Sequence, residues 1–137
     1  MVVDILLHQQ EFKRDSIISK KTKIMKNLRN QVQLIGRLGA DPEVKSLNSG
    51  TKVARFSLAT SDYYKDKEGN KIEDTQWHKI IAWNGSATYT DKYLKKGMEI
   101  VVSGKLVYGS YDDKDGNKRY TTEIVANDML ILSKKED

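Results

Sequence analysis

Five stretches with β-strand character, separated by clusters of Gly, Asn, Asp and Pro, constrain the fold of this chain more than any other feature. Such residues break regular structure, whereas the apolar–polar alternation between them is typical of strands with one buried face. The predicted strands span residues 32–38, 53–60, 75–83, 98–108 and 118–125, and residues 43–47 could extend the first of them. Residues 61–74 are predicted to form a polar hairpin loop and residues 112–117 a second hairpin tip. The pattern predicts a mostly β protein.

One helix is predicted over residues 86–96, between the third and fourth strands. Ser86 stands near its N-cap, Lys95 and Lys96 lie in its last turn, and Gly97 follows, which are residue types preferred at those positions. Five strands with a helix between the third and fourth match the five-stranded Greek-key barrel of the OB-fold. A small antiparallel sandwich would also accommodate the pattern, though less well.

The strand over residues 75–83 carries the most unusual side chains. Because side chains alternate across a strand, Trp77 and Trp83 share one face, with Lys79 and Ile81 between them. An isolated buried lysine is costly, which favours an exposed position for this face. Two indole rings with an ammonium group between them suit a flexible polyanion, since rings stack on bases and cations contact phosphates. The strand therefore indicates a surface for single-stranded nucleic acid.

Composition is compatible with such a partner. The chain has 137 residues, a net charge of +5 and a pI near 9.3, which favour polyanionic partners without proving one. It contains no cysteine, which excludes a disulfide framework and thiol chemistry and is usual in a reducing cytosol. Its apolar runs are far too short to span a membrane. One globular domain is expected.

An enzyme is not expected, and neither a metal nor another cofactor is predicted. His8 and His78 are the only histidines, and the sequence shows no nucleophile elbow and no Gly-rich phosphate loop. Residues 66–70 and 113–117 resemble parts of calcium loops. However, Thr75 and Thr122 would stand where Ca²⁺ requires a carboxylate. Both segments are better interpreted as hairpin tips.

His78 alternates to the strand face opposite Trp77, together with Ile80 and Ala82. It is predicted to be a core histidine or one at a subunit interface. An unperturbed imidazole has a pKa of about 6.5, so burial at an interface would make assembly sensitive to mild acid.

Five motifs, in this order, resemble the bacterial single-stranded DNA-binding protein (SSB) family. They lie at residues 33–44 (QLIGRLGADPEV), 56–61 (FSLATS), 75–78 (TQWH), 93–97 (YLKKG) and 119–123 (RYTTE), at family spacing within residues 27–132. The resemblance implies an OB-fold that binds and protects single-stranded DNA without sequence preference in replication, recombination and repair. It also implies a homo-oligomer, usually a homotetramer.

The resemblance also implies which residues contact DNA. Trp77 falls on the Trp of the family's Thr-x-Trp-His motif, and Trp83 falls where the family commonly has Phe. Tyr64 and Tyr111 fall at positions where a stacking Trp is often found, and their smaller rings should weaken stacking without abolishing it. The lysines at positions often basic in the family, which would neutralise phosphates, are Lys45, Lys67, Lys79 and Lys96.

The two ends of the chain differ from the central domain, residues 25–132. Residues 1–24 precede Met25 and are expected to be a flexible arm or the product of an upstream start of translation. Residues 133–137 form a short C-terminal end without the acidic tip that recruits replication and repair enzymes in most family members, so recruitment is doubtful. The resemblance implies a cytoplasmic location at the bacterial nucleoid, with no membrane partner.

The sequence alone leaves two other interpretations of the aromatic face open. One is an RNA-binding or primosome-type OB module. The other is a domain that docks another protein through the aromatic face and binds no nucleic acid.

Overall fold

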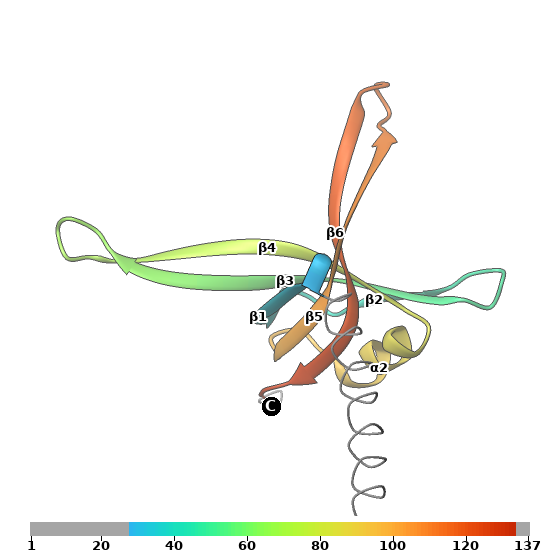
Figure 1. The fold of residues 1–137 in the computed structure, drawn as a ribbon, viewed down its shortest axis with the longest axis horizontal. Helices are drawn as coiled ribbons and strands as arrows, with labels where there is room; N and C mark the ends of the chain where they lie inside the picture. The colour runs from blue at the N-terminus through green and yellow to red at the C-terminus, as the bar shows by residue number, and fades with distance from the viewer. Residues whose placement is uncertain (1–27, 134–137) are drawn as a thin grey trace, which may run out of the picture. The chain divides into compact units, whose positions relative to one another are not determined.

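The computed structural model describes residues 28–133, so the predicted N-terminal extension, residues 1–24, lies outside the described part. Its elements in chain order are β1 (Val32–Leu38), β2 (Glu43–Ser46), β3 (Lys52–Lys65), β4 (Lys71–Trp83), α2 (Gly85–Tyr93), β5 (Glu99–Asp112) and β6 (Lys118–Ile131). Figure 1 shows their arrangement. Among the described residues, no helix is long and apolar enough to cross a membrane.

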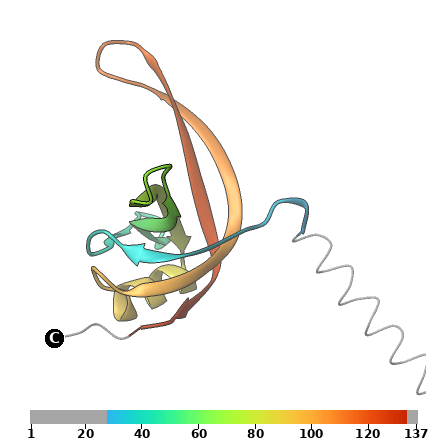
Figure 2. The ribbon, with the colours of Figure 1, turned by 90° about the vertical axis from the view of Figure 1, so that its left-hand side faces the viewer.

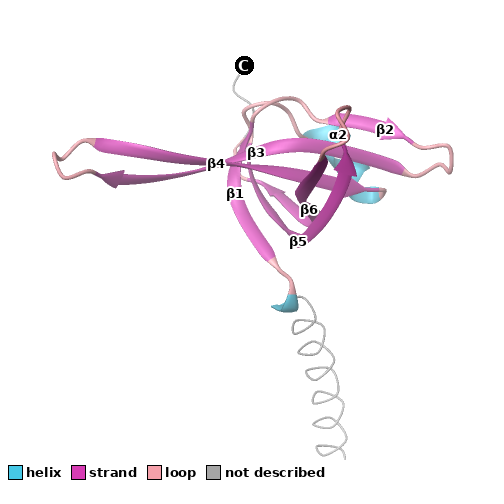
Figure 3. Cartoon of the chain, turned by 90° about the horizontal axis from the view of Figure 1, so that it is seen from above, coloured by secondary structure: helices cyan, strands magenta, loops and turns pink. Residues whose placement is uncertain are grey.

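The strands close into a barrel (Figures 2 and 3). Hydrogen bonds join them in the order β1-β5-β6-β4-β3, and β1 also pairs with β3, which closes a ring of five strands. The pairs in this ring are antiparallel except β4 and β6, which run parallel. The predicted OB-fold is confirmed. β2 pairs with β3, so the stretch predicted as a possible extension of the first strand is a separate short strand that begins after the turn at residues 39–42.

Two hairpins extend well beyond the barrel, one from β3 and β4 and the other from β5 and β6 (Figure 1). The first stays paired as far as Lys65 and Lys71, and the second as far as Asp112 and Lys118. The prediction that residues 61–74 form a loop is therefore wrong, because the loop is confined to residues 66–70. Side chains in the β3–β4 arm are largely exposed on both faces, so the sequence there lacks the alternation that marks a half-buried strand.

The two hairpin tips have the same geometry, as expected for turn residues. In the first, the Oδ1 of Asp66 accepts hydrogen bonds from the backbone N–H groups two and four residues later, and Gly69 has a positive φ. In the second, Asp113 and Gly116 play the same parts. Glycine tolerates the left-handed conformation without steric cost. Both tips are thus ordered by local bonds.

At the second tip, the Asp113 carboxylate should be sensitive to acid. The hydrogen bond from the backbone of Asn117 is the main cause that holds the pKa of this carboxyl below its usual value of 3.8, with help from Arg119. Because folding lowers the pKa of Asp113, its ionised carboxylate stabilises the tip fully at pH values above the pKa of the unfolded state. This stabilisation is lost as pH falls through the lower folded-state pKa. We expect the Asn117 amide resonance to titrate with a midpoint below 3.8. A midpoint at or above that value would contradict this account.

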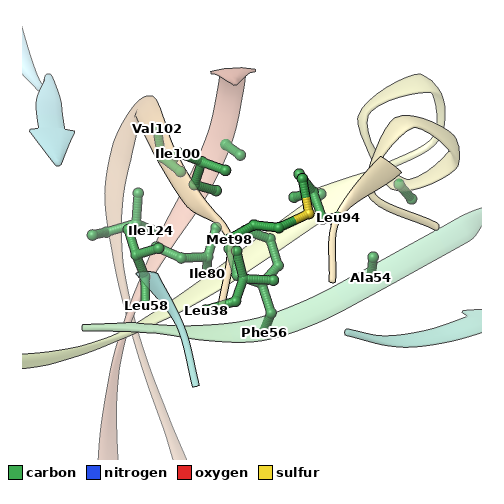
Figure 4. Packing of buried hydrophobic residues seen from close by; sticks show 13 residues of the cluster. Leu38, Ala54, Phe56, Leu58, Ile80, Leu94, Met98, Ile100, Val102 and Ile124 are labelled. Carbon is green, nitrogen blue, oxygen red and sulfur yellow. The ribbon is translucent and has the colours of Figure 1, made fainter. Parts of the chain in front are cut away.

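The barrel interior is filled by apolar side chains from every strand of the ring (Figure 4). Leu58, Ile80, Ile100 and Val102 are among its fully buried members, and Leu94 joins them from the turn that follows α2. Alternate positions of β3 and β4 therefore point inward, which leaves the intervening positions on the outer face. This core fixes which side chains are available for binding.

The helix begins and ends earlier than predicted. Its N-cap is Asn84, not Ser86, and it ends at Tyr93 with Leu94 as the C-cap, while Gly97 lies in the following turn. Asn84 adopts φ 51° and ψ −114°, and its side chain makes no capping hydrogen bond. This backbone conformation is unfavourable for a residue with a Cβ, and it occurs directly after Trp83.

Replacing Asn84 with glycine should stabilise the protein. Glycine adopts the conformation of Asn84 without steric strain, and the lost side chain makes no capping bond. We expect the free energy of unfolding to rise by about 1 kcal/mol, the lower end of the cost of such strain. Urea denaturation of N84G and the parent chain measures the difference. A lower midpoint for N84G would show that the asparagine contributes an interaction that outweighs the strain.

Candidate nucleic-acid interface

The outer face of β3 and β4 carries the predicted aromatic pair. Trp77 is 62% exposed and Trp83 is 40% exposed, so neither ring is part of the core. They lie six residues apart on one strand, about 20 Å at roughly 3.3 Å per residue. Lys79 lies exposed between them. The structure thus places two indole rings and one ammonium group on the same side of the barrel, as the alternation predicted.

Trp77 lies against a glycine that leaves room for its ring. A Cβ on Gly39 would stand 2.5 Å from the Cζ3 of Trp77, closer than two carbon atoms can approach. Gly39 follows β1, and its backbone N–H donates to the carbonyl of Ser57 on β3. The turn after β1 therefore supports one edge of the indole while more than half of the side chain stays open to solvent.

Two adjoining hollows lie along this face. The larger, about 490 Å³, is lined by residues that include Glu43, Arg55, Ser57, Lys79 and Glu123. The smaller, about 240 Å³, is lined by residues that include Trp77, Lys79, Tyr120 and Thr121. Lys79 and Thr121 border both hollows, so the two adjoin, and the smaller lies beside the exposed ring of Trp77; the two hollows together are called the groove.

The predicted tyrosines lie in the hairpin arms, away from Trp77. Tyr64 is exposed, but the pairing of β3 and β4 places it on the strand face of His78, whereas its neighbour Tyr63 shares the face of Trp77. The Nζ of Lys71 lies 4.3 Å from the centre of the Tyr63 ring. Tyr111 is exposed near the end of the other arm, opposite Arg119. The exposed rings of these tyrosines therefore lie on both hairpin arms, outside the groove.

The four predicted lysines are all exposed, but they are dispersed. Only Lys79 lies in the groove. Lys45 on β2 belongs to the cross-strand row that ends at Trp83. Lys67 is at the tip of the β3–β4 hairpin. Lys96 lies in the turn after α2, where its backbone N–H donates to the Oδ1 of Asp41 at 2.9 Å.

His78 faces away from Trp77, on the side of the buried residues Ile80 and Ala82, as the alternation predicted. Its Nε2 lies 2.8 Å from the Oγ1 of Thr60, and the ring is partly buried. A role of His78 at a subunit interface stays a prediction.

Two groove residues were missed by reasoning from the sequence. Tyr120 is 79% exposed and lines the same hollow as Trp77, although it lies on β6. Arg55 shares its strand face with Ser57 and lines the larger hollow. Alternation within β3 could have identified Arg55 as outward-facing, whereas Tyr120 shares its strand face with the buried Ile124 and is exposed because it lies in the hairpin arm. Only the pairing of strands shows that Arg55 and Tyr120 meet at the groove.

The described part of the chain offers no group of three or more His, Cys, Asp or Glu side chains that could hold a metal ion. The groove instead combines aromatic rings, cations and carboxylates on the outside of a closed barrel. An OB-fold barrel with an exposed aromatic and basic face is the architecture of a class of proteins that bind single-stranded nucleic acids.

Comparisons with known proteins identify the family. Residues 29–132 match the model of the single-strand binding protein family. Over 109 residues the chain is 49% identical to single-stranded DNA-binding protein 1 of Xylella fastidiosa (strain 9a5c), covering 79% of this chain and 80% of that protein. It is 48% identical over 108 residues to single-stranded DNA-binding protein 1 of Chlorobaculum tepidum, covering 78% and 67% respectively.

Solved structures agree. A Plasmodium falciparum SSB in complex with single-stranded DNA superposes with a TM-score of 0.68 at 35% identity, covering 76% of this chain and 95% of that one. A deletion mutant of the single-stranded DNA binding protein from Thermus aquaticus gives a TM-score of 0.65 at 31% identity, covering 76% and 50%. The chain belongs to the single-strand binding protein family, whose members are DNA-binding proteins and not enzymes.

Proposed function

We propose that the OB-fold domain, residues 25–132, binds and protects single-stranded DNA without sequence preference during replication, recombination and repair in the cytoplasm. The observation that carries this proposal is the exposure of Trp77 and Trp83 on one face, with Lys79 between them. The rings stack on bases, and every base offers a π-face, so stacking tolerates any sequence.

Contacts outside the groove extend the binding surface. Tyr64 and Tyr111 add stacking platforms on the two hairpin arms, while Lys45, Lys67, Lys79 and Lys96 neutralise phosphates along the strand. Phosphate contacts position a strand but carry no sequence information. One OB-fold of this kind covers about 4–16 nucleotides.

The domain self-associates in this proposal, as a homotetramer. Support comes from an apolar row across the outer face of β1, β5 and β6, where the pairing places Ile35, Val101 and Leu130 side by side. Ile35 and Leu130 are large exposed apolar residues. Burying such a row between copies is favourable. Several DNA-binding faces joined in one particle would raise affinity through effective concentration. Sedimentation equilibrium measures the mass of the assembly, and a monomer at micromolar concentration would contradict this part.

Sequence-independent binding is tested by competition. A labelled oligo-dT bound to the protein is displaced by unlabelled single strands of equal length and different sequence, followed by fluorescence anisotropy. We expect DNA competitors of mixed sequence to displace it at similar concentrations and the matched duplex to displace it poorly. Oligo-U serves as the RNA competitor. Displacement by oligo-U at lower concentration than by any DNA strand would contradict the proposal and favour an RNA partner.

A further inference from the structure

An arginine in the groove is held by a carboxylate of another strand. The Nε of Arg55 lies 3.6 Å from the Oε2 of Glu123, and their side chains are 56% and 26% exposed. Both residues line the larger hollow together with Lys79. The partly exposed position and the long distance make this a weak ion pair, readily exchanged for another partner.

The pair spans the strand that carries the tryptophans. Arg55 lies on β3 and Glu123 on β6, and β4 lies between these strands in the sheet. The pairing of β3 and β4 sets Arg55 opposite Ile81, which is only 5% exposed although its strand face is the outer one. The Arg55 side chain therefore reaches across β4 close to Ile81, between the positions of Trp77 and Trp83.

The larger hollow is lined by two cations, Arg55 and Lys79, and by three carboxylates, one of which is the Glu123 that pairs with Arg55. Glu43 on β2 is paired in register with Arg55. Asp41 also lines the hollow, and its Oδ1 accepts a hydrogen bond from the backbone N–H of Lys96. These carboxylates repel a phosphate from their side of the hollow. Arg55 and Lys79 provide its attractive side.

We propose that this hollow is a phosphate-binding subsite for a strand that lies across Trp77 and Trp83, with Arg55 as its main ligand. In the free protein Arg55 is paired with Glu123. In the complex with DNA, a backbone phosphate replaces Glu123 as the partner of Arg55. A guanidinium group binds phosphate through two parallel hydrogen bonds, so the exchange is favourable when DNA arrives. Because DNA must displace Glu123 from Arg55, Glu123 lowers the affinity of the protein for single-stranded DNA. The subsite rests on the proposed DNA-binding function.

Neutralising Glu123 tests the exchange. We expect E123Q to bind oligo-dT about two- to fivefold more tightly at low salt, because DNA no longer competes with a weak ion pair. We expect R55Q to bind about tenfold more weakly, since a charge-assisted contact is lost. For R55Q, the slope of log binding constant against log salt concentration should be shallower by about 0.7, the value for one phosphate contact on a single strand. The double variant R55Q/E123Q should bind like R55Q, because Glu123 acts only through Arg55.

The matched control is D91N, which makes the same change of net charge. Asp91 forms an ion pair of 3.0 Å with Lys52, which alternates to the opposite strand face from Arg55. D91N should bind as the parent chain does. A gain in D91N equal to that in E123Q, or a double variant that keeps the gain, would overturn the subsite. Failure of the parent chain to bind oligo-dT would instead overturn the proposed function, and the subsite with it. Circular dichroism confirms that each variant is folded.

Discussion

The variant W77A/W83A should bind oligo-dT more weakly than the parent chain by about 2–6 kcal/mol, since each stacked base contributes about 1–3 kcal/mol. Both rings are exposed on one face, and neither belongs to the buried core, so their loss should act on binding more than on folding. Titration of a labelled oligo-dT followed by anisotropy measures the change.

Replacing Tyr93 provides a control for this experiment. Tyr93 is an exposed ring at the end of α2, where its ring centre lies 5.0 Å from that of Tyr89. It does not line either hollow of the groove. Y93A should bind oligo-dT as the parent chain does. Parental affinity in a folded W77A/W83A variant would refute the assignment of the two tryptophans.

Gly36 should be among the positions of the barrel least tolerant of substitution. It lies on β1 beside the short seam where Arg37 and Leu38 pair with β3 and close the barrel. A Cβ at Gly36 would clash with the carbonyl oxygen of Ala59, a backbone atom that cannot move without opening the seam. We expect G36A to lower the free energy of unfolding by about 3 kcal/mol, the upper end of the usual cost of overpacking.

Urea denaturation of G36A is best compared with that of G85A. A Cβ at Gly85 would meet nothing within 4 Å at the start of α2. Alanine at such a position should be neutral or slightly stabilising, because it restricts the unfolded chain. Equal stability of G36A and G85A would show that the seam has room for a side chain.

The barrel could be predicted from the sequence because its strands are half-buried. Alternation in residues 53–60 and 75–83 reports one inward face, and Gly, Asn and Asp mark the turns between strands. The β3–β4 arm was missed, since its side chains are largely exposed on both faces. β2 is only four residues long, and its place depends on pairing with β3. Asn84 was missed because its unusual backbone follows from the fixed ends of β4 and α2.

The interface was predicted to the extent that it lies on one strand. Period-two alternation placed Trp77, Lys79 and Trp83 together without knowledge of their neighbours. Tyr120 and Arg55 join them from other strands, and their proximity depends on strand order and register. Strand order and register involve residues far apart in the sequence, so alternation within a single strand gives no information on them. The same limit applies to Ile81, which lies on the outer face but is buried.

Fluorescence titration of the protein with oligo-dT at two salt concentrations tests the central claim most directly. Trp77 and Trp83 are the only tryptophans of the chain, so the signal reports on the proposed stacking platforms alone. We predict strong quenching, with an affinity that falls as salt rises at a log–log slope of about −0.7 for each phosphate contacted. Unchanged fluorescence and no binding even at low salt would contradict the claim and leave the aromatic face to another partner.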